Sequence, residues 1–587
     1  NGFFGREMVH PQVRIVQEGA PLAQALTPVY PTTAGLPQAY LRKAVAAGLA
    51  RAPLDELIPP TLLPPRLPTL RESLHFLHHP SPDTSLVALE DHSHPAWQRL
   101  KFEELLAQQV SQMQARAERA HLKAPVLQAH AQGLPERLLA VLPFQLTGAQ
   151  QRVCAEIAAD LARPVPMHRL LQGDVGSGKT VVAALAAAVA MDAGWQCALM
   201  APTEILAEQH FRKLVDWLAP LGIKVAWLTG SLKAKVKREQ LAAVASGEAQ
   251  LVVGTHAVIQ DQVEFAKLGL ALIDEQHRFG VAQRLQLRSK LQSRDLEPHL
   301  LMMSATPIPR TLAMTYLADL EVSTIDELPP GRTPIVTRVF ADSRREDVIE
   351  RIRDEVAKGS QVYWVCPLID ETEDSDQAAD EVAGRDSNKR PPLDLSNVTQ
   401  THQELSEALP GFGVGLLHGR LPTAEKADVM ARFSSGELSV LVATTVIEVG
   451  VDVPNASLMV IEHAERFGLS QLHQLRGRVG RGAVASVCVL LYASPLSDSG
   501  KQRLKAMAET TDGFEIARRD LEIRGPGEFM GARQSGAALL RFADLHEDEA
   551  LVARARQVAE VLLREHPQAA QRHVGRWLGH KSEYLKA

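Results

Sequence analysis

The feature that most constrains this chain is a glycine-rich loop directly after the apolar pair Leu170-Leu171. The loop reads Gly173, Asp174, Val175, Gly176, Ser177, Gly178, Lys179 and Thr180. In such a loop the backbone N–H groups surround a β-phosphate, the lysine reaches the β- and γ-phosphate oxygens, and the threonine hydroxyl binds Mg²⁺. The string therefore predicts a strand, a phosphate loop and a helix whose N-terminus faces the phosphates of a bound nucleotide.

A second, acidic string, Asp274-Glu275-Gln276-His277, follows the apolar run from Leu268 to Ile273. A carboxylate at the end of a strand is placed to bind Mg²⁺, and a neighbouring carboxylate is placed to act on the attacking water. We therefore expect Asp274 to bind the metal together with Thr180, and Glu275 to activate the water. One such string alone is compatible with chance or with a buried acidic turn. Two strings in this order, each at the carboxyl end of a strand, predict an ATP hydrolase.

Composition narrows the class of protein. A chain of 587 residues is too long for one core and predicts several domains. No stretch approaches the roughly 20 uninterrupted apolar residues of a membrane span, and residues 1–20 contain no apolar signal-peptide core. The four cysteines are far apart and form no Cys-x-x-Cys pair, which favours free thiols in a reducing cytosol. Because the net charge is -6, a nucleic-acid role must rest on local basic patches.

The pattern of apolar and polar residues divides the chain into four regions. A proline- and leucine-rich, mostly helical region covers residues 1–140, two α/β units cover 141–326 and 327–495, and a charged helical region covers 496–587. In both α/β units short apolar strands alternate with amphipathic helices, which is typical of a parallel sheet. The expected strands are 169–172, 197–201, 225–228, 250–254, 270–273 and 299–304 in the first unit, and 335–340, 361–367, 413–417, 440–443, 458–461 and 487–492 in the second. The acidic, polar segment 370–392 predicts a disordered surface loop.

The second α/β unit lacks a phosphate loop but carries the string Gln474-Leu475-Arg476-Gly477-Arg478-Val479-Gly480-Arg481. Arginines that reach across a cleft to a γ-phosphate act as arginine fingers. An arginine-rich solvated helix end is the alternative, but paired Gly-Arg repeats beside a phosphate loop favour the finger role. We therefore expect Gln474, Arg478 and Arg481 to complete the ATP site when the two units close.

These strings and several shorter ones resemble, in collinear order, the motifs of superfamily 2 helicases over residues 144–482. The resemblance implies two tandem RecA-like parallel-sheet motor domains. It also implies that Phe144 stacks on adenine, that Gln150 reads the adenine edge, and that Asp452, in motif V, contributes to the nucleotide site. The residues with an implied role in DNA contact or in coupling hydrolysis to domain movement are Thr203, Thr229, Thr255, His277, Ser304, Thr306 and Thr444.

Within superfamily 2 the chain resembles the RecG family of bacterial branched-DNA translocases, on residues 274–280, 303–311 and 519–536. The last passage resembles a translocation motif, a helical hairpin in which Arg524 and Gln534 are expected to couple ATP turnover to movement on DNA. The segment 370–392 makes this chain longer there than is usual in the family.

The N-terminal residues resemble part of a second RecG domain. Residues 5–11 look like the closing strand of an oligonucleotide-binding (OB) wedge, so residues 1–20 are expected to end that wedge. Residues 21–140 are then expected to form a helical linker domain. Because the chain opens at Asn1, without an initiator methionine, most of the wedge is expected to lie upstream.

The resemblance implies an ATP- and Mg²⁺-dependent translocase on double-stranded DNA that reverses stalled replication forks and migrates Holliday junctions in recombination and repair. It further implies a cytoplasmic, nucleoid-associated monomer without a membrane role, with single-stranded DNA-binding protein as a candidate partner. Three alternatives stay open: a transcription-repair coupling factor-like translocase, a non-catalytic junction-binding protein and, more weakly, an RNA helicase. No polymerase-binding module precedes the motor, the intact Lys179, Asp274, Glu275 and Arg481 argue against a scaffold, and the DNA-type translocation motif argues against an RNA substrate.

Three other groups of residues have a structural interpretation. The histidines His75, His78, His79, His92 and His94 cluster in the sequence, but no acidic or cysteine partners stand at metal-ligand spacing, which favours surface histidines over a metal site. Leu100, Leu105, Leu106 and Val110 fall at helical spacing and are expected in a core. For the basic run at 231–238, phosphate contact and a solvated helix face are equally compatible.

Overall fold

The computed structural model describes residues 25–32, 36–275, 296–305, 320–329, 334–367, 393–444, 453, 455–480, 485–524, 540–544 and 547–579. The chain separates into two compact units. Unit 1 comprises Asn1–Val110 and Leu540–Ser582, and unit 2 comprises Ser111–Leu539 and Glu583–Ala587. Within the described residues, no helix is both long enough and apolar enough to cross a membrane.

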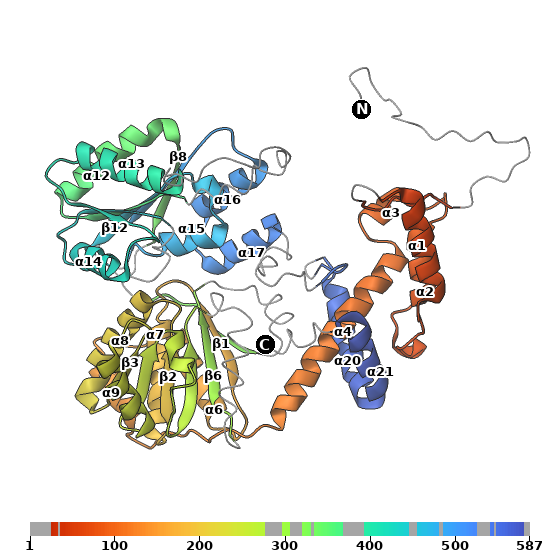
Figure 1. Cartoon of the computed structure of the whole chain (residues 1–587), viewed down its shortest axis with the longest axis horizontal. Helices are drawn as coiled ribbons and strands as arrows, with labels where there is room; N and C mark the ends of the chain where they lie inside the picture. Colours follow the sequence, from red (N-terminus) through yellow and green to blue (C-terminus); the bar gives the residue numbers. More distant parts are fainter. Residues whose placement is uncertain are drawn as a thin grey trace, which may run out of the picture. The chain divides into compact units, whose positions relative to one another are not determined.

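Unit 2 contains two parallel sheets, each of which organises one lobe (Figure 1). The sheet of lobe 1 has the order β3-β4-β2-β5-β6-β1-β7, and that of lobe 2 has the order β10-β11-β9-β12-β13-β8. The strands of lobe 1 are β1 (His168–Gly173), β2 (Gln196–Met200), β3 (Val225–Leu228), β4 (Leu251–Gly254), β5 (Leu268–Ile273), β6 (His299–Ser304) and β7 (Glu321–Ile325). The strands of lobe 2 are β8 (Val336–Ala341), β9 (Gln361–Val365), β10 (Val414–Leu417), β11 (Val440–Ala443), β12 (Ala456–Ile461) and β13 (Val487–Tyr492).

Helices connect the strands of both lobes (Figure 1). Those of lobe 1 are α5 (Leu134–Val141), α6 (Gly148–Leu161), α7 (Lys179–Asp192), α8 (Glu204–Leu218), η2 (Ala219–Leu221), α9 (Ala234–Ala245) and η3 (His256–Ile259). Those of lobe 2 are η5 (Asp342–Arg344), α12 (Arg345–Ala357), α13 (Leu393–Ala408), α14 (Thr423–Ser434), η7 (Ala464–Arg466), α15 (Leu469–Arg476), α16 (Asp498–Glu509) and α17 (Gly513–Arg524).

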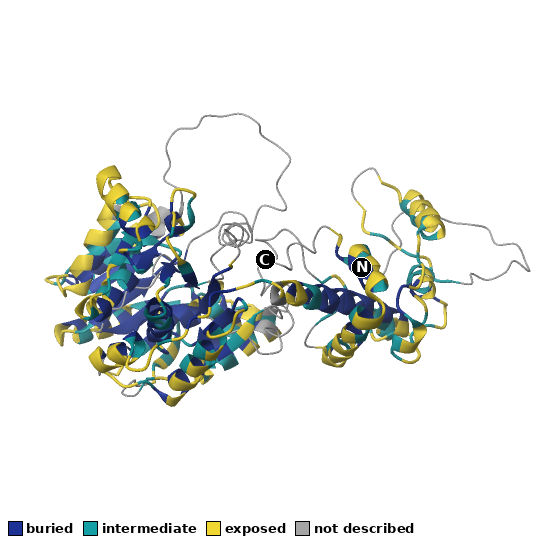
Figure 2. Cartoon of the chain, turned by 90° about the horizontal axis from the view of Figure 1, so that it is seen from below, coloured by how far each residue is buried: buried dark blue, intermediate teal, exposed yellow. Residues whose placement is uncertain are grey.

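The central strands of the lobe 1 sheet, β1, β2, β4, β5 and β6, are buried on both faces, as a parallel sheet flanked by helices requires (Figure 2). Successive residues of one strand point to opposite faces. Leu171 therefore packs in the core that includes α6, α7 and α8, whereas Leu170 packs in a second core with Met200 and Ile273. Helix α7 is alanine-rich and buried along most of its length, so it lies close against the sheet and its N-terminus is fixed at the end of β1.

The predicted strands are confirmed, each to within two residues at either end. Strand β7 was not predicted. It lies at the edge of the sheet, its polar residues Ser323 and Thr324 break the apolar pattern, and its pairing with β1 is supported by side-chain bonds. Arg169 donates to Ser323 at 2.7 Å, and Gln172 donates to Thr324 at 3.0 Å. Residues 1–20 and the acidic segment 370–392 lie outside the described residues.

Unit 1 is helical. It contains α1 (Gln38–Arg51), η1 (Pro60–Leu62), α2 (Leu70–His78), α3 (Leu86–Glu90), the first part of α4 (Pro95–Ala120), α20 (Glu549–Glu565) and α21 (Pro567–Trp577). Leu100, Leu105, Leu106 and Val110 are buried on α4, as predicted. Segments more than 400 residues apart in the sequence thus share one core.

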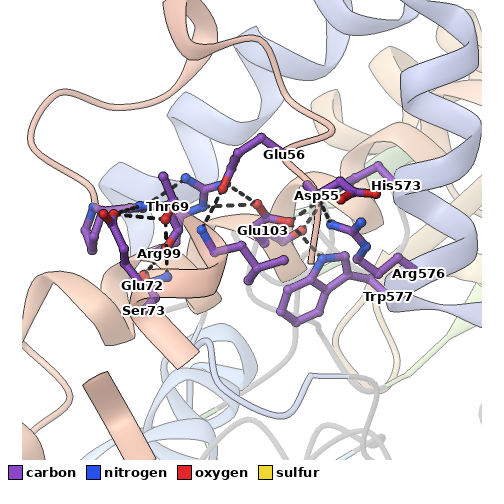
Figure 3. A network of polar contacts seen from close by, with 12 residues as sticks. Asp55, Glu56, Thr69, Glu72, Ser73, Arg99, Glu103, His573, Arg576 and Trp577 are labelled. Carbon is purple, nitrogen blue, oxygen red and sulfur yellow. Dashed lines mark hydrogen bonds and ion pairs between the residues drawn. The ribbon is translucent and has the colours of Figure 1, made fainter. Parts of the chain in front are cut away.

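Buried polar side chains on α4 hold the C-terminal helices. Glu103 is 1% exposed, accepts hydrogen bonds from Arg99 and from Trp577 Nε1 at 2.9 Å, and lies 3.4 Å from His573 Nδ1 (Figure 3). Glu104 accepts the backbone N–H groups of residues 541–543 at 2.7 to 3.1 Å, and Lys101 pairs with Asp548 at 3.0 Å. Each charged side chain in these contacts has an oppositely charged or hydrogen-bonding partner, which is the condition under which buried charges are tolerated.

Candidate active site

The parallel sheet of lobe 1 brings the predicted motifs to one edge. The phosphate loop follows β1, Asp274 follows β5, Ser304 ends β6, and β6 lies between β1 and β5. The residues that follow β2, β3 and β4 lead into Thr203, Thr229 and Thr255. Because the carboxyl ends of parallel strands share an edge, all of these residues lie along it, and open α/β sheets bind ligands at this edge.

The phosphate loop has the conformation that its glycines permit. Gly176 and Gly178 have φ angles of 79° and 87°, in the left-handed region, and helix α7 begins at Lys179 directly after Gly178. The ammonium group of Lys179 donates to the backbone carbonyls of Gly173 at 2.8 Å and Asp174 at 2.9 Å. The lysine and the helix N-terminus therefore lie at the same loop, as phosphate binding requires.

Gln150 contacts the phosphate loop from helix α6. Its side chain accepts the N–H of Thr147 at 2.9 Å in a capping box and donates to the carbonyl of Ser177 at 2.8 Å. A Cβ at Gly178 would lie 2.2 Å from Gln150 Nε2 at a φ of 87°, so a side chain there would displace Gln150 and strain the backbone. Phe144, in contrast, is 45% exposed and meets Trp217 edge-on, with ring centroids 6.3 Å apart. The exposed ring is compatible with stacking on adenine, and that role remains a prediction.

Asp274 and Glu275 lie at the end of β5. Asp274 is buried, its Oδ1 accepts the N–H of Glu275 at 3.0 Å, and its Oδ2 lies 2.6 Å from Nε2 of His210. Burial alone would raise the pKa of Asp274, but the charge and hydrogen bond of His210, together with Lys179, hold the pKa below its ordinary value. An ionised carboxylate is a hard oxygen ligand of the kind that Mg²⁺ prefers, so Asp274 fits the metal role. Glu275 has a φ of 50°, in the left-handed region that non-glycine residues seldom adopt and that recurs at active sites.

His210 was missed in the sequence. A lone histidine in an amphipathic helix is most often a core or surface residue, and nothing in the spacing of α8 links it to Asp274. The two residues meet only in the fold, where α8 follows β2 in the chain and β2 pairs with β5.

In lobe 2, helix α15 carries Gln474 and is followed by Arg478, and both side chains are buried. Arg476 is also buried, but it binds within lobe 2: its guanidinium donates to Thr337 Oγ1 at 3.2 Å and to the carbonyls of Met507 and Thr510, each at 2.9 Å. Arg476 is therefore a structural residue of the arginine-rich string. Arg481 and Asp452 lie outside the described residues, so their roles remain predictions.

A second contact missed in the sequence joins the lobes of unit 2. Nε2 of His473, on α15, lies 2.5 Å from Oδ1 of Asp174 in the phosphate loop. Next to it, a Cβ at Gly477 would lie 2.6 Å from Cβ of Val175. The phosphate loop is thus in direct contact with the helix that bears Gln474.

The residues predicted to contact DNA or to couple hydrolysis to domain movement lie in different kinds of position. Thr203 caps helix α8 by accepting the N–H of Leu206 at 3.4 Å, and Thr229 is buried with its hydroxyl 3.2 Å from that of Ser231. Thr255, Ser304 and Thr444 are buried at or just after strand ends. Arg524 is the last residue of α17. His277, Thr306 and Gln534 lie outside the described residues.

The histidines of unit 1 pack against rings. The rings of Phe76 and His94 stack at 4.2 Å, those of His92 and Trp97 also lie 4.2 Å apart, and Tyr30 hydrogen-bonds His78 at 2.9 Å. Among the described residues, no group of three or more His, Cys, Asp or Glu side chains is arranged to hold a metal ion. The basic run leads into α9 (Ala234–Ala245), and its residues Lys233, Lys235 and Arg238 are exposed.

Three family models match consecutive parts of the chain: DEAD/DEAH box helicase over residues 147–315, helicase conserved C-terminal domain over 347–483, and ATP-dependent DNA helicase RecG, domain 3, C-terminal, over 510–577. Over its whole length the chain is 52% identical to ATP-dependent DNA helicase RecG of Escherichia coli strain K12, of which it covers 82%. The chain belongs to the RecG family. The RecG protein of Haemophilus influenzae is 50% identical over 99% of this chain and 82% of the relative.

The structural comparison agrees. A RecG structure bound to a three-way DNA junction matches with a TM-score of 0.67 and 38% identity, covering 90% of this chain and 66% of that one. The predicted architecture of two tandem RecA-like motor domains between helical regions is therefore confirmed, and so is the assignment to an ATP-dependent DNA helicase family. The RecG-specific C-terminal domain disfavours the alternatives of a transcription-repair coupling factor-like translocase and a non-catalytic scaffold.

Proposed function

We propose that this chain hydrolyses Mg-ATP to translocate on double-stranded DNA and to remodel branched DNA, by reversing stalled forks and migrating Holliday junctions in recombination and repair. The observation that carries the proposal is the 52% identity to RecG helicases over the whole chain, in which both motor domains and the RecG-specific domain are present. The three-way junction in the related RecG structure supports a branched substrate.

We infer the following roles for the site residues within this proposal. The loop 173–180 and the N-terminus of α7 would hold the triphosphate, with Lys179 released from the carbonyls of Gly173 and Asp174 to reach the phosphate oxygens. Mg²⁺ would bind to Thr180 and Asp274 and supply charge neutralisation at the phosphates. Glu275 would orient the attacking water. Gln474, Arg478 and Arg481 of lobe 2 would complete the site.

We also propose an oligomeric state, a partner and a location for the protein. The protein would act as a monomer, single-stranded DNA-binding protein would be a partner at stalled forks, and the chain would reside in the cytoplasm with the nucleoid. They are supported by the family assignment alone.

The experiment is a titration of ATPase activity with a three-way junction, a linear duplex of equal length, and no DNA, each at two salt concentrations. We expect both DNAs to stimulate hydrolysis, and the stimulation to fall steeply with salt because phosphate contacts release counterions. ATPase activity that neither DNA stimulates at low salt would contradict the proposed function.

A further inference from the structure

Three positions of lobe 2 meet the phosphate loop at Asp174 and Val175. His473 Nε2 bonds the carboxylate of Asp174 at 2.5 Å. Gly477 lies so close to Val175 that a Cβ there would come within 2.6 Å. At Gly513, the first residue of α17, a Cβ would lie 2.7 Å from His473 Nε2 and 3.1 Å from Cγ of Asp174. The start of α17 thus lies directly on the Asp174–His473 contact.

The two hydrogen-bond partners of the His473 ring determine which ring nitrogen carries the proton. Its Nδ1 lies 3.2 Å from NH2 of Arg476, and a guanidinium has only donors. Nδ1 must therefore accept, which places the ring proton on Nε2, where it is donated to Asp174. The orientation of the ring is thus fixed at both nitrogens.

Arg476 extends this path to the helices that follow the motor. Its guanidinium also donates to the carbonyls of Met507, near the end of α16, and Thr510, in the turn before α17. A second bond, between Ser470 of α15 and Asp520 of α17 at 2.8 Å, holds the two helices together. Helix α17 lies in the segment that matches the RecG-specific domain.

On the other side, Asp174 belongs to the phosphate loop itself. Its carbonyl accepts from Lys179, and its carboxylate also accepts the N–H of Val175 at 2.6 Å. Burial raises the pKa of Asp174, but the hydrogen bond from His473, the N–H of Val175 and the charge of Lys179 outweigh this effect and hold the pKa below its ordinary value. A change in the position of Lys179 therefore acts directly on the residue that bonds His473.

We propose that His473 is a positioning residue. Its hydrogen bond to Asp174 holds α15, the helix that bears Gln474, against the phosphate loop. Through this bond, a movement of the phosphate loop during ATP turnover also moves α17. The inference rests on the proposed DNA-driven ATPase and deepens it, because it names the contact through which the phosphate loop reaches the RecG-specific segment. The bond is part-buried and charge-assisted, and hydrogen bonds to an ionised group are roughly twice as strong as neutral ones.

The test compares His473→Ala with His473→Gln, whose side-chain amide places a donor near the position of Nε2. We expect His473→Ala to lower the kcat of junction-stimulated ATP hydrolysis about tenfold while the KM for ATP changes less than about threefold, since the phosphate contacts stay intact. His473→Gln should recover most of the rate. The matched control is His402→Ala, which removes another lobe 2 histidine, one that bonds the carbonyl of Val414 at 3.2 Å.

A double-mutant cycle shows whether the two residues act through one bond. The double variant Asp174→Ala with His473→Ala should be no slower than Asp174→Ala alone, because the bond is already lost. Thermal unfolding of each variant distinguishes loss of the contact from loss of the fold, and His473→Gln serves where His473→Ala does not fold.

Two results would overturn the inference: junction-stimulated kcat of folded His473→Ala within about twofold of wild type, or equal defects in folded His473→Gln and His473→Ala. Junction conversion by the wild type is measured in parallel. If the wild type hydrolyses ATP with DNA but converts no junction, the proposed function fails, while the ATPase comparison still judges the Asp174–His473 contact.

Discussion

The imidazole of His210, on helix α8, lies 2.6 Å from Oδ2 of Asp274 at the end of strand β5. The other carboxylate oxygen of Asp274 accepts the N–H of Glu275, so both oxygens are oriented by protein donors. Partners of this kind orient a metal-binding carboxylate.

His210→Ala should therefore weaken the use of Mg²⁺. Loss of such an outer partner typically costs about 10–100-fold in metal affinity or activity, so we expect the Mg²⁺ concentration for half-maximal ATPase to rise by about tenfold or more. The measurement is ATPase activity against Mg²⁺ at saturating ATP, with His402→Ala as the control. An unchanged Mg²⁺ dependence would show that His210 only packs.

Asp274 and Glu275 should separate metal binding from water activation. Glu275→Gln should bind Mg-ATP with near-normal affinity and fail to hydrolyse it, because Asp274 remains to contact the metal. Asp274→Asn should lose Mg-ATP affinity as well, and its uncharged amide also changes the bond to His210. Equilibrium binding of a fluorescent ATP analogue with Mg²⁺, beside single-turnover hydrolysis, distinguishes the two. Equal losses of nucleotide affinity would contradict the separate roles.

Arg524, at the end of α17, should matter for coupling more than for hydrolysis. We expect Arg524→Ala to keep most of its DNA-stimulated ATPase while strand separation falls sharply, because the residue is far in sequence from the phosphate loop and lies in the RecG-specific segment. The ratio of base pairs separated to ATP hydrolysed is the measurement. A proportional fall in both activities would assign the residue to folding or DNA binding instead.

Unit 1 provides a stability test. Glu103→Ala would leave the guanidinium of Arg99, which is fully buried, with Glu56 as its remaining ion-pair partner among the described residues, and would remove the acceptor of Trp577 Nε1 (Figure 3). Breaking a buried pair in this way costs about 3–5 kcal/mol. We expect a lower unfolding midpoint in urea and faster proteolysis of the C-terminal helices.

The control for Glu103→Ala is Glu565→Ala, which removes an exposed partner of Arg564 and should change stability by less than about 1 kcal/mol. If the two variants unfolded alike, the network around Glu103 would not be what holds α20 and α21 to α4.

The two motor domains could be predicted from the sequence because the motifs that mark them are local. A glycine-rich loop, an acidic pair after an apolar run, and strands alternating with helices each lie within a short window, and parallel pairing then places their ends at one edge. Strand β7 was not predicted because an edge strand that contains Ser323 and Thr324 has no apolar pattern.

The contacts that the sequence did not predict are long-range. His210 and Asp274 are 64 residues apart, Asp174 and His473 are 299 apart, and Glu103 and Trp577 are 474 apart. None of these pairs has a spacing that marks it, since the partners meet only after the sheets and helices have packed. His473 even stands next to a predicted residue, Gln474, yet its own role follows from the neighbours of both ring nitrogens.

In the proposed function, ATP hydrolysis at the phosphate loop drives remodelling of branched DNA. The most direct test is conversion of a labelled three-way junction by the wild type and by Lys179→Ala, with Mg-ATP and with Mg-ADP, beside a gel-shift measurement of junction binding. We expect the wild type to convert the junction only with ATP. Lys179→Ala should bind the junction with similar affinity but convert it several powers of ten more slowly, because phosphoryl transfer depends on charge placed at the phosphates. Conversion by Lys179→Ala at a rate near that of the wild type, or by the wild type without ATP, would contradict the account.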